Sequence, residues 1–216
     1  MKPKKKDIRS LTKEQLREFF VNNGDKAFRG NQVYEWLWSK SLHTFEDIDK
    51  ITSPEGLGMS SKRITVSTSG VPKIIKKMAD DEVKFNLAVS LHSAIDEVRT
   101  SIMPFNETFP LEDLAESLKY WYEKTSRQIT YEYVVWDGIN DRKEDIKALV
   151  DFCQHIPCKV NLIEYNPIDD GEFQQASSRA IDNYISILEM NDIVVNVRRS
   201  RGKDIDAACG QLANKS

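Results

Sequence analysis

Residues 129–165 read ITYEYVVWDGINDRKEDIKALVDFCQHIPCKVNLIEY, and this stretch predicts a strand, a helix and a second strand in succession. The first strand fits Ile129–Val135 and ends in polar turn residues, Asp137–Asp141. A helix then fits Lys143–Cys153, and the second strand fits Lys159–Tyr165. Strands that alternate with helices in this way are typical of parallel sheets joined by right-handed crossovers.

The same alternation extends along most of the chain. Further strands are expected over Lys62–Ser67, Phe85–Ser90 and Ile193–Arg198, and further helices over Val71–Met78, Leu111–Lys124 and Ser178–Met190. Two helices precede them: Thr12 caps the first, which Gly24 ends, and the second fits Gly30–Lys40. We therefore predict an α/β protein with a small helical domain over residues 1–47 and an incomplete (β/α) barrel over residues 48–216. Five strands leave such a barrel open, so its first strands are expected to be missing.

Composition and charge exclude several classes of protein. Hydrophobic residues make up 40% and charged residues 30% of the chain, which indicates a soluble globular protein and not a disordered one. No apolar run approaches the roughly 18 residues of a membrane span, and none follows the basic start, Met1–Lys6, so we expect a cytoplasmic protein that binds no membrane. The net charge of -3 offers nucleic acid no overall attraction. RNA binding would therefore need local basic patches, of which there are three: Lys2–Lys6; Lys73, Lys76 and Lys77; and Arg198, Arg199, Arg201 and Lys203.

Polar residues follow four of the expected strands where each strand ends. They are Ser67–Gly70, Ser90–His92, Asp137–Asp141 and Asn166–Pro167. The carboxyl edge of a parallel sheet is where barrels and open α/β sheets bind their ligands, so these residues predict a small-molecule site there. The alternative is that they are turn residues only, because Ser, Gly, Asn and Asp are also the residues that turns need.

The chain has three cysteines, and their spacing fits neither a disulfide framework nor a metal motif. Cys209 is flanked by small residues and preceded by four cations, an environment that favours a reactive thiolate. The alternative is a buried cysteine that fills a small space. Cys153 and Cys158 lie next to the ends of predicted elements and are interpreted as structural.

Several sequence blocks resemble one enzyme family. DIDAACGQL, residues 204–212, resembles the carboxyl-terminal signature of the RlmN/Cfr family, the radical S-adenosylmethionine methyltransferases that act on carbon 2 of adenine in ribosomal RNA and, in many members, transfer RNA. Ser67–Gly70, Ser90–His92 and Asn161–Pro167 resemble three further family blocks in the same order. The resemblance covers Ser53–Asn214, and Leu11–Lys40 is more loosely similar to the helical amino-terminal domain of the family.

This resemblance implies roles for individual residues. Cys209 matches the cysteine that carries the methyl group as S-methylcysteine, and the residues expected to contact S-adenosylmethionine are Ser67, Ser90, Leu91, His92 and Asn166. It also implies a radical S-adenosylmethionine barrel, a 4Fe-4S cluster, ribosomal RNA and tRNA as partners, an electron donor such as flavodoxin, and a monomer.

The chain departs from the family pattern at one place. The family's Cys-x-x-x-Cys-x-x-Cys and Gly-Glu-Pro motifs are absent, and the sequence passes from Thr44–Asp47 directly to Asp49–Ser53. We therefore assign no metal ligands and expect this form to be inactive. Two other functions stay open: a noncatalytic RNA-binding or regulatory module, and an α/β protein that binds a small nucleotide-like ligand.

Overall fold

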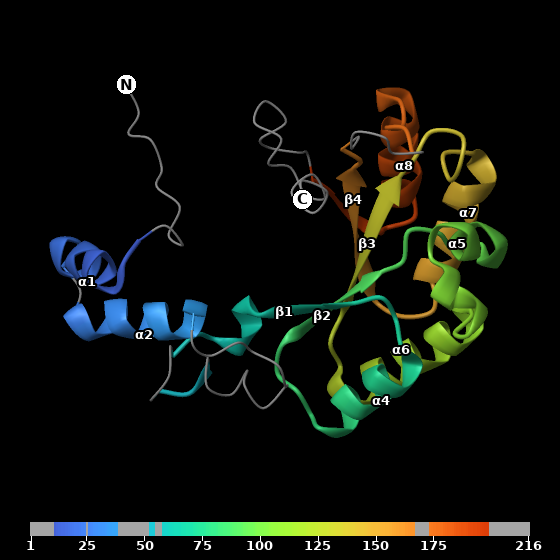
Figure 1. Ribbon diagram of the computed structural model, residues 1–216. Coiled ribbons are helices and arrows are strands. Elements are labelled where there is room, and N and C mark those ends of the chain that lie inside the picture. The colour runs from blue at the N-terminus through green and yellow to red at the C-terminus, as the bar shows by residue number, and fades with distance from the viewer. Residues whose placement is uncertain (1–10, 25, 39–51, 55–57, 167–172, 199–216) are drawn as a thin grey trace. The chain divides into compact units, whose positions relative to one another are not determined.

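The computed structural model describes residues 11–24, 26–38, 52–54, 58–166 and 173–198 (Figure 1). The chain divides into two compact units, Met1–Ser60 and Ser61–Ser216. Among the described residues, no helix is long and apolar enough to cross a membrane.

The first unit contains two packed helices, α1 (Lys13–Asn22) and α2 (Ala27–Trp38). Thr12 caps α1 through a capping box with Gln15, as the sequence predicted. The second helix begins three residues before the predicted start at Gly30. A Cβ atom on Gly30 would lie 2.5 Å from the backbone nitrogen of Arg17, so this glycine permits the close approach of the two helices and does not mark a helix start.

The second unit is built on one parallel sheet. Its strands are β1 (Thr65–Thr68), β2 (Asn86–Ser90), β3 (Ile129–Val135), β4 (Cys158–Glu164) and β5 (Val194–Arg198), and they pair in sequence order. The five predicted strands and their parallel pairing are confirmed. The first strand starts later than expected, because Ser61–Arg63 forms a short 3₁₀-helix, η2, in place of the strand's first residues.

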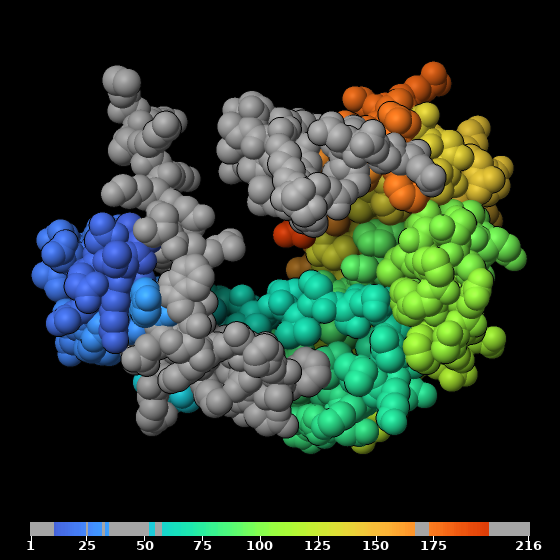
Figure 2. All heavy atoms as spheres, viewed as in Figure 1, coloured from blue at the N-terminus to red at the C-terminus, as the bar shows by residue number. Residues whose placement is uncertain are grey.

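Helices connect each strand to the next. They are α4 (Pro72–Asp80), α5 (Asp96–Ile102), α6 (Leu111–Thr125), α7 (Lys143–Cys153) and α8 (Ser178–Met190), with a 3₁₀-helix, η3 (Pro104–Glu107), between α5 and α6. Strands in consecutive order with right-handed crossovers place all these helices on one face of the sheet, and Figure 1 shows them along one side of the strands. In Figure 2, the teal atoms around β1 and α4 adjoin the green atoms around α5 on the surface.

The core lies between this helical layer and the sheet. Tyr131 and Tyr133 are fully buried and face the helices, where their rings contact Phe152 of α7 and Tyr184 of α8 at centroid distances of 5.6 and 5.5 Å. Alternate residues of β3 and β4 therefore point to the opposite face of the sheet. This is the arrangement of an incomplete (β/α) barrel, in which the helix-free face is the one that a closed barrel would enclose.

Candidate functional site

The predicted ligand contacts lie at the carboxyl edge of the sheet. Ser67 is an exposed residue of β1, Ser90 is the last residue of β2, and Leu91 and His92 follow it directly. Asn166 lies two residues beyond the end of β4. Because the strands are parallel, all five residues share one edge of the sheet. Their role as ligand contacts stays a prediction, and Cys209 and Pro167 lie outside the described residues.

Backbone contacts hold His92 in one orientation. Its φ angle of 58° lies in the left-handed region, which non-glycine residues seldom adopt. The amides of Leu91 and His92 donate to the carbonyl oxygen of Glu132, and the amide of Val134 donates to His92 Nδ1 at 3.2 Å. The last bond requires an unprotonated Nδ1, so the proton of the neutral ring is on Nε2.

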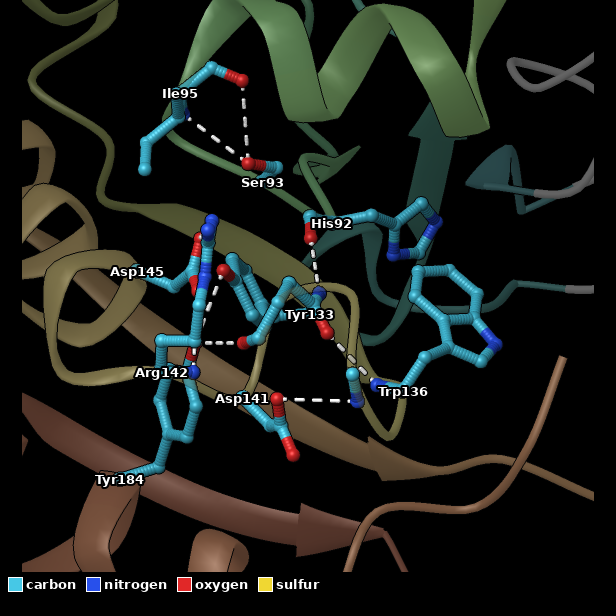
Figure 3. Close-up of polar contacts among 11 residues, drawn as sticks. His92, Ser93, Ile95, Tyr133, Trp136, Asp141, Arg142, Asp145 and Tyr184 are labelled. Atoms are coloured by element: carbon cyan, nitrogen blue, oxygen red, sulfur yellow. Dashed lines mark hydrogen bonds and ion pairs between the residues drawn. The ribbon is translucent and has the colours of Figure 1, made fainter.

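The environment of His92 also disfavours a charged ring. Burial, the larger cause, and the positive charge of Arg99 lower the pKa of His92 to about 4. The ring contacts the indole of Trp136 edge to face at a centroid distance of 5.7 Å, and Figure 3 shows the two rings side by side. At neutral pH, His92 is therefore an uncharged side chain whose Nε2–H donor has no hydrogen-bond partner in the part of the chain that the structure describes.

Asn140 locks the turn after β3, within the Asp137–Asp141 block. Its side chain is fully buried, accepts from the amide of Trp136 at 2.7 Å and donates to the carbonyl oxygens of His92 and Val134 at 2.7 and 2.8 Å. Figure 3 shows His92 and Trp136, two of the residues whose backbone groups Asn140 contacts. Asn140 therefore saturates backbone groups, as the turn-residue interpretation of this block expected, and leaves nothing free for a ligand.

Arg99 of α5 lies beneath the ends of β1 and β2, and its side chain is fully buried. It donates through Nε to the carbonyl oxygen of Leu91, through Nη2 to those of Ser69 and Ser90, and through Nη1 to Asn106 Oδ1. Burial lowers its pKa to about 10, partly offset by Asp96, so the guanidinium stays charged at neutral pH. Sequence reasoning missed both α5 and Arg99. The signal was a single arginine, seven residues beyond His92, in the short segment Asp96–Ile102.

A second polar group lies on the helix-free face of the sheet. Glu132 of β3 accepts from Asn161 of β4 at 2.8 Å and from Arg198 of β5 at 3.1 Å, and Asn161 accepts from Asn196 at 3.1 Å. Glu132 is largely buried, whereas the Arg198 side chain is 62% exposed. These side chains on three neighbouring strands thus form one hydrogen-bonded row, which lies on the face of the sheet that a closed barrel would enclose.

Two buried polar atoms at the same edge have no hydrogen-bond partner within the described chain. They are Asn166 Oδ1 and Trp136 Nε1, in residues that are 5% and 8% exposed. A buried polar atom without a partner costs free energy, so such atoms are candidates for contact with a ligand. Asn166 is the one of the two that the sequence predicted as a ligand contact.

The predicted basic patches are only partly described. Lys73 and Lys76 are exposed on α4, and Lys77 beside them forms an ion pair with Asp81 at 2.6 Å. Arg198 pairs with Glu132. Lys2–Lys6 and the cations from Arg199 to Lys203 lie outside the described residues.

The two described cysteines lie at the opposite, amino edge of the sheet. Cys153 ends α7 and Cys158 begins β4, both are buried, and Cys158 Sγ lies 3.6 Å from the Cys153 carbonyl oxygen. The hydrogen bond with the neighbouring Cys158 thiol, and then burial, raise the pKa of Cys153. Over the described ranges, no group of three or more His, Cys, Asp or Glu side chains is arranged to hold a metal ion. These two cysteines are placed as structural residues, away from the candidate site.

Comparisons with known proteins relate both units to one family. Residues 6–53 match the family model of the ribosomal RNA large subunit methyltransferase N-terminal domain. The whole chain is 46% identical to a probable dual-specificity RNA methyltransferase RlmN of Christiangramia forsetii over 98% of that protein, and 46% identical to the protein of the same name from Flavobacterium psychrophilum over 99% of it. A solved radical SAM methyltransferase from Sphaerobacter thermophilus matches 74% of this chain and 47% of its own with a TM-score of 0.71 and 38% identity.

The aligned lengths are greater than the length of this chain for some relatives and cover only part of others. The alignment with the C. forsetii protein extends over 346 positions, whereas this chain has 216 residues, so about 130 positions of the relative have no counterpart here. The alignment covers nearly all of both proteins, so these positions are internal to it. The relative from Salinibacter ruber aligns over 172 residues, which are 79% of this chain but 47% of that protein. The part of the relatives that matches this barrel is thus about half of their length.

Proposed function

This chain belongs to the RlmN family of dual-specificity RNA methyltransferases, and from this premise we propose that it binds S-adenosylmethionine and RNA but does not hold the iron–sulfur cluster of that family. The observation that carries the ligand assignment is the carboxyl edge of the sheet. The Ser67 and Ser90 hydroxyl groups, the His92 ring and Asn166 all lie at that edge, and within the described ranges Asn166 Oδ1 has no hydrogen-bond partner while His92 Nδ1 accepts from a backbone amide.

The residues of this edge fit S-adenosylmethionine by their chemistry. Asn166 Oδ1 is a buried acceptor that the described residues leave unsatisfied, and His92 supplies a donor whose other ring nitrogen is already occupied. Hydroxyl, imidazole and amide groups are suited to the ribose, the adenine and the amino-acid part of the molecule. When bound, S-adenosylmethionine supplies an electrophilic methyl group. Ser67, Ser90, His92 and Asn166 bind and orient the molecule, and buried Leu91 closes the edge on the protein side.

The residues present do not fit a 4Fe-4S cluster. Such clusters are held by cysteine thiolates, and the three cysteines of this sequence do not form the family pattern. Cys153 and Cys158 are buried at the amino edge of the sheet, away from the predicted ligand site. The segment of about 130 positions that the relatives have and this chain lacks is the expected place of the missing ligands. We therefore assign no radical step to this chain.

Cys209 is the predicted methyl-accepting thiol. It lies outside the described residues, so its role rests on the residues around it and on the family resemblance. Four cations precede it in the sequence, and positive charge nearby lowers the pKa of a thiol and stabilises the thiolate.

RNA is the proposed macromolecular partner. The support is the amino-terminal family domain over residues 6–53 and the names of the relatives, which are RNA methyltransferases. Ribosomal RNA and tRNA are the proposed targets, with the exposed Lys73 and Lys76 and the cations around Arg198 as candidate phosphate contacts. A monomer in the cytoplasm is proposed, and an electron donor such as flavodoxin would act only on a form of the protein that holds the cluster.

The test of the ligand assignment is isothermal titration of S-adenosylmethionine into the full chain. We expect one site per chain, and we expect Asn166→Ala to weaken binding at least tenfold, in line with the roughly 1–3 kcal/mol of one lost buried hydrogen bond. Asn191→Ala is the matched control, because Asn191 ends α8 at the opposite edge of the sheet and is exposed. Equal effects of the two substitutions, or no binding at millimolar ligand, would contradict the assignment.

A further inference from the structure

Arg99 connects two strand ends that the predicted ligand site requires. Its guanidinium group holds the carbonyl oxygen of Ser69 beyond β1 at 2.8 Å, that of Ser90 at the end of β2 at 3.3 Å, and that of Leu91 at 3.1 Å. These three carbonyl groups belong to the two segments that contain Ser67 and His92. A single rigid side chain therefore fixes the spacing of those segments.

The neighbours of Arg99 show how it is held in place. Asn106 of η3 accepts from Nη1 of Arg99, and its own amide group donates to Asp96 Oδ1 at 2.8 Å and to Thr100 Oγ1 at 3.0 Å. The guanidinium lies 5.0 Å from the ring centroid of Phe105. On its other side is Gly70, whose added Cβ would lie 3.5 Å from Nη2. Arg99 is thus enclosed by α5, η3 and the turn after β1.

The charge of Arg99 acts on His92 as well. Among the described residues, the elements around His92 carry several charged or titratable groups: Asp96, Glu97 and Arg99 on α5, Tyr131, Glu132 and Tyr133 on β3, Asp137 and Asp141 in the turn after β3, and Tyr165 after β4. Arg99 is the one whose charge shifts the pKa of His92, and it disfavours the protonated ring. Asp96 accepts from Asn106 and the Leu111 amide, and Glu132 accepts from Asn161 and Arg198.

We propose that Arg99 is the positioning residue of the predicted S-adenosylmethionine site, which it serves by fixing the ends of β1 and β2 and so the place of His92 beside them. This inference rests on the proposed function for the identity of the ligand. Arg99 itself is fully buried under the two segments and therefore acts through their backbone groups. His92 then offers Nε2–H to an acceptor atom of the ligand, and it neither transfers a proton nor carries a charge at neutral pH.

Two substitutions separate the two contributions of Arg99. Arg99→Lys keeps the positive charge but cannot hold three carbonyl groups at once, whereas Arg99→Gln removes both the charge and the fork of donors. The matched control is Arg127→Gln, because Arg127 also holds two backbone carbonyl groups, those of Lys84 and Phe85, at the amino end of β2. Asn106→Ala is a milder variant that keeps Arg99 and removes one of its partners.

We expect Arg99→Lys and Arg99→Gln to weaken S-adenosylmethionine binding by the full chain at least tenfold, Asn106→Ala about threefold, and Arg127→Gln less than twofold, all by calorimetry at pH 7.5. If Arg99 had only a structural role, the Arg99 and Arg127 variants would lose affinity in proportion to their loss of melting temperature. That result would overturn the proposal. If Arg99→Gln does not fold, Arg99→Lys and Asn106→Ala decide the outcome.

A spectroscopic measurement on the ligand-free chain completes the test. Nitrogen-15 NMR of the imidazole rings should show His92 with its proton on Nε2 and no titration between pH 8 and 5 in the unaltered chain and in Arg99→Lys. In Arg99→Gln, the ring should titrate at higher pH than in the unaltered chain. An unchanged His92 signal in Arg99→Gln would overturn the positioning role by itself, whereas failure of the unaltered chain to bind S-adenosylmethionine would overturn the proposed function and the ligand assigned here.

Discussion

Replacement of Asn140 by alanine tests how the turn after β3 is held. The substitution removes the acceptor for the Trp136 amide and the donors for the carbonyl oxygens of His92 and Val134, all in a fully buried position. Each backbone group left without a partner costs about 1–3 kcal/mol, so three of them cost about 3–9 kcal/mol if little water enters. Because a domain of this kind has a free energy of unfolding of about 5–15 kcal/mol, the loss is a large fraction of the total.

The assay is urea unfolding followed by tryptophan fluorescence and by circular dichroism. We expect Asn140→Ala to lower the free energy of unfolding by at least about 3 kcal/mol without changing the slope against urea. Asn191→Ala is the control, since its amide donates to one backbone carbonyl at 2.8 Å in an exposed position and should cost less than about 1 kcal/mol. A loss below about 1 kcal/mol for Asn140→Ala would refute the reasoning, because it would mean that water or another group satisfies all three backbone groups.

Three further predictions concern single residues. The pKa of His92 is about 4 in the folded chain and 6.5 when unperturbed, so between these pH values the unfolded state binds more protons than the folded state. The free energy of unfolding should therefore fall as the pH is lowered from 6.5 toward 4. His92→Gln should flatten this part of the pH profile of urea unfolding. Tyr184→Phe removes a buried hydroxyl group that donates to the Asn140 carbonyl oxygen at 2.5 Å, and it should cost about 1–2 kcal/mol in the same assay. Gly30→Ala would place a Cβ 2.5 Å from the backbone of Arg17, so α1 and α2 must separate. In thermal unfolding followed by circular dichroism, the contribution of these two helices to the helical signal should be lost in the variant.

The layout of the sheet could be predicted from sequence because its signals are local. β3 is largely buried, β4 alternates buried and partly exposed residues, and both are bounded by turn residues; such patterns are recognisable without knowledge of their partners. The short helix α5 was missed for the opposite reason. It has seven residues and no side-chain cap, and the buried Arg99 that anchors it makes contacts with strand ends that no local pattern shows.

The same distinction separates the parts of the candidate site. Ser90–His92 and Asn166 were found because they follow predicted strands and match family blocks. The importance of Glu132 could not be seen in this way, since its partner Arg198 is 66 residues away and their pairing depends on the register of three strands. Asn140 was noticed, but as part of a possible ligand edge. Its buried contacts assign it to the turn, which is the other interpretation that its residue type allowed.

We propose that this RlmN-family chain cannot hold the family's cluster by itself. The most direct measurement is anaerobic reconstitution of the full chain with iron and sulfide, followed by removal of unbound metal and determination of iron per chain and of the absorbance near 400 nm. With three cysteines that do not form the family pattern, two of them buried at the amino edge, we predict less than about one iron per chain and no cluster band. About four irons per chain with a stable cluster band would contradict the claim and would show that other residues of the chain supply the ligands.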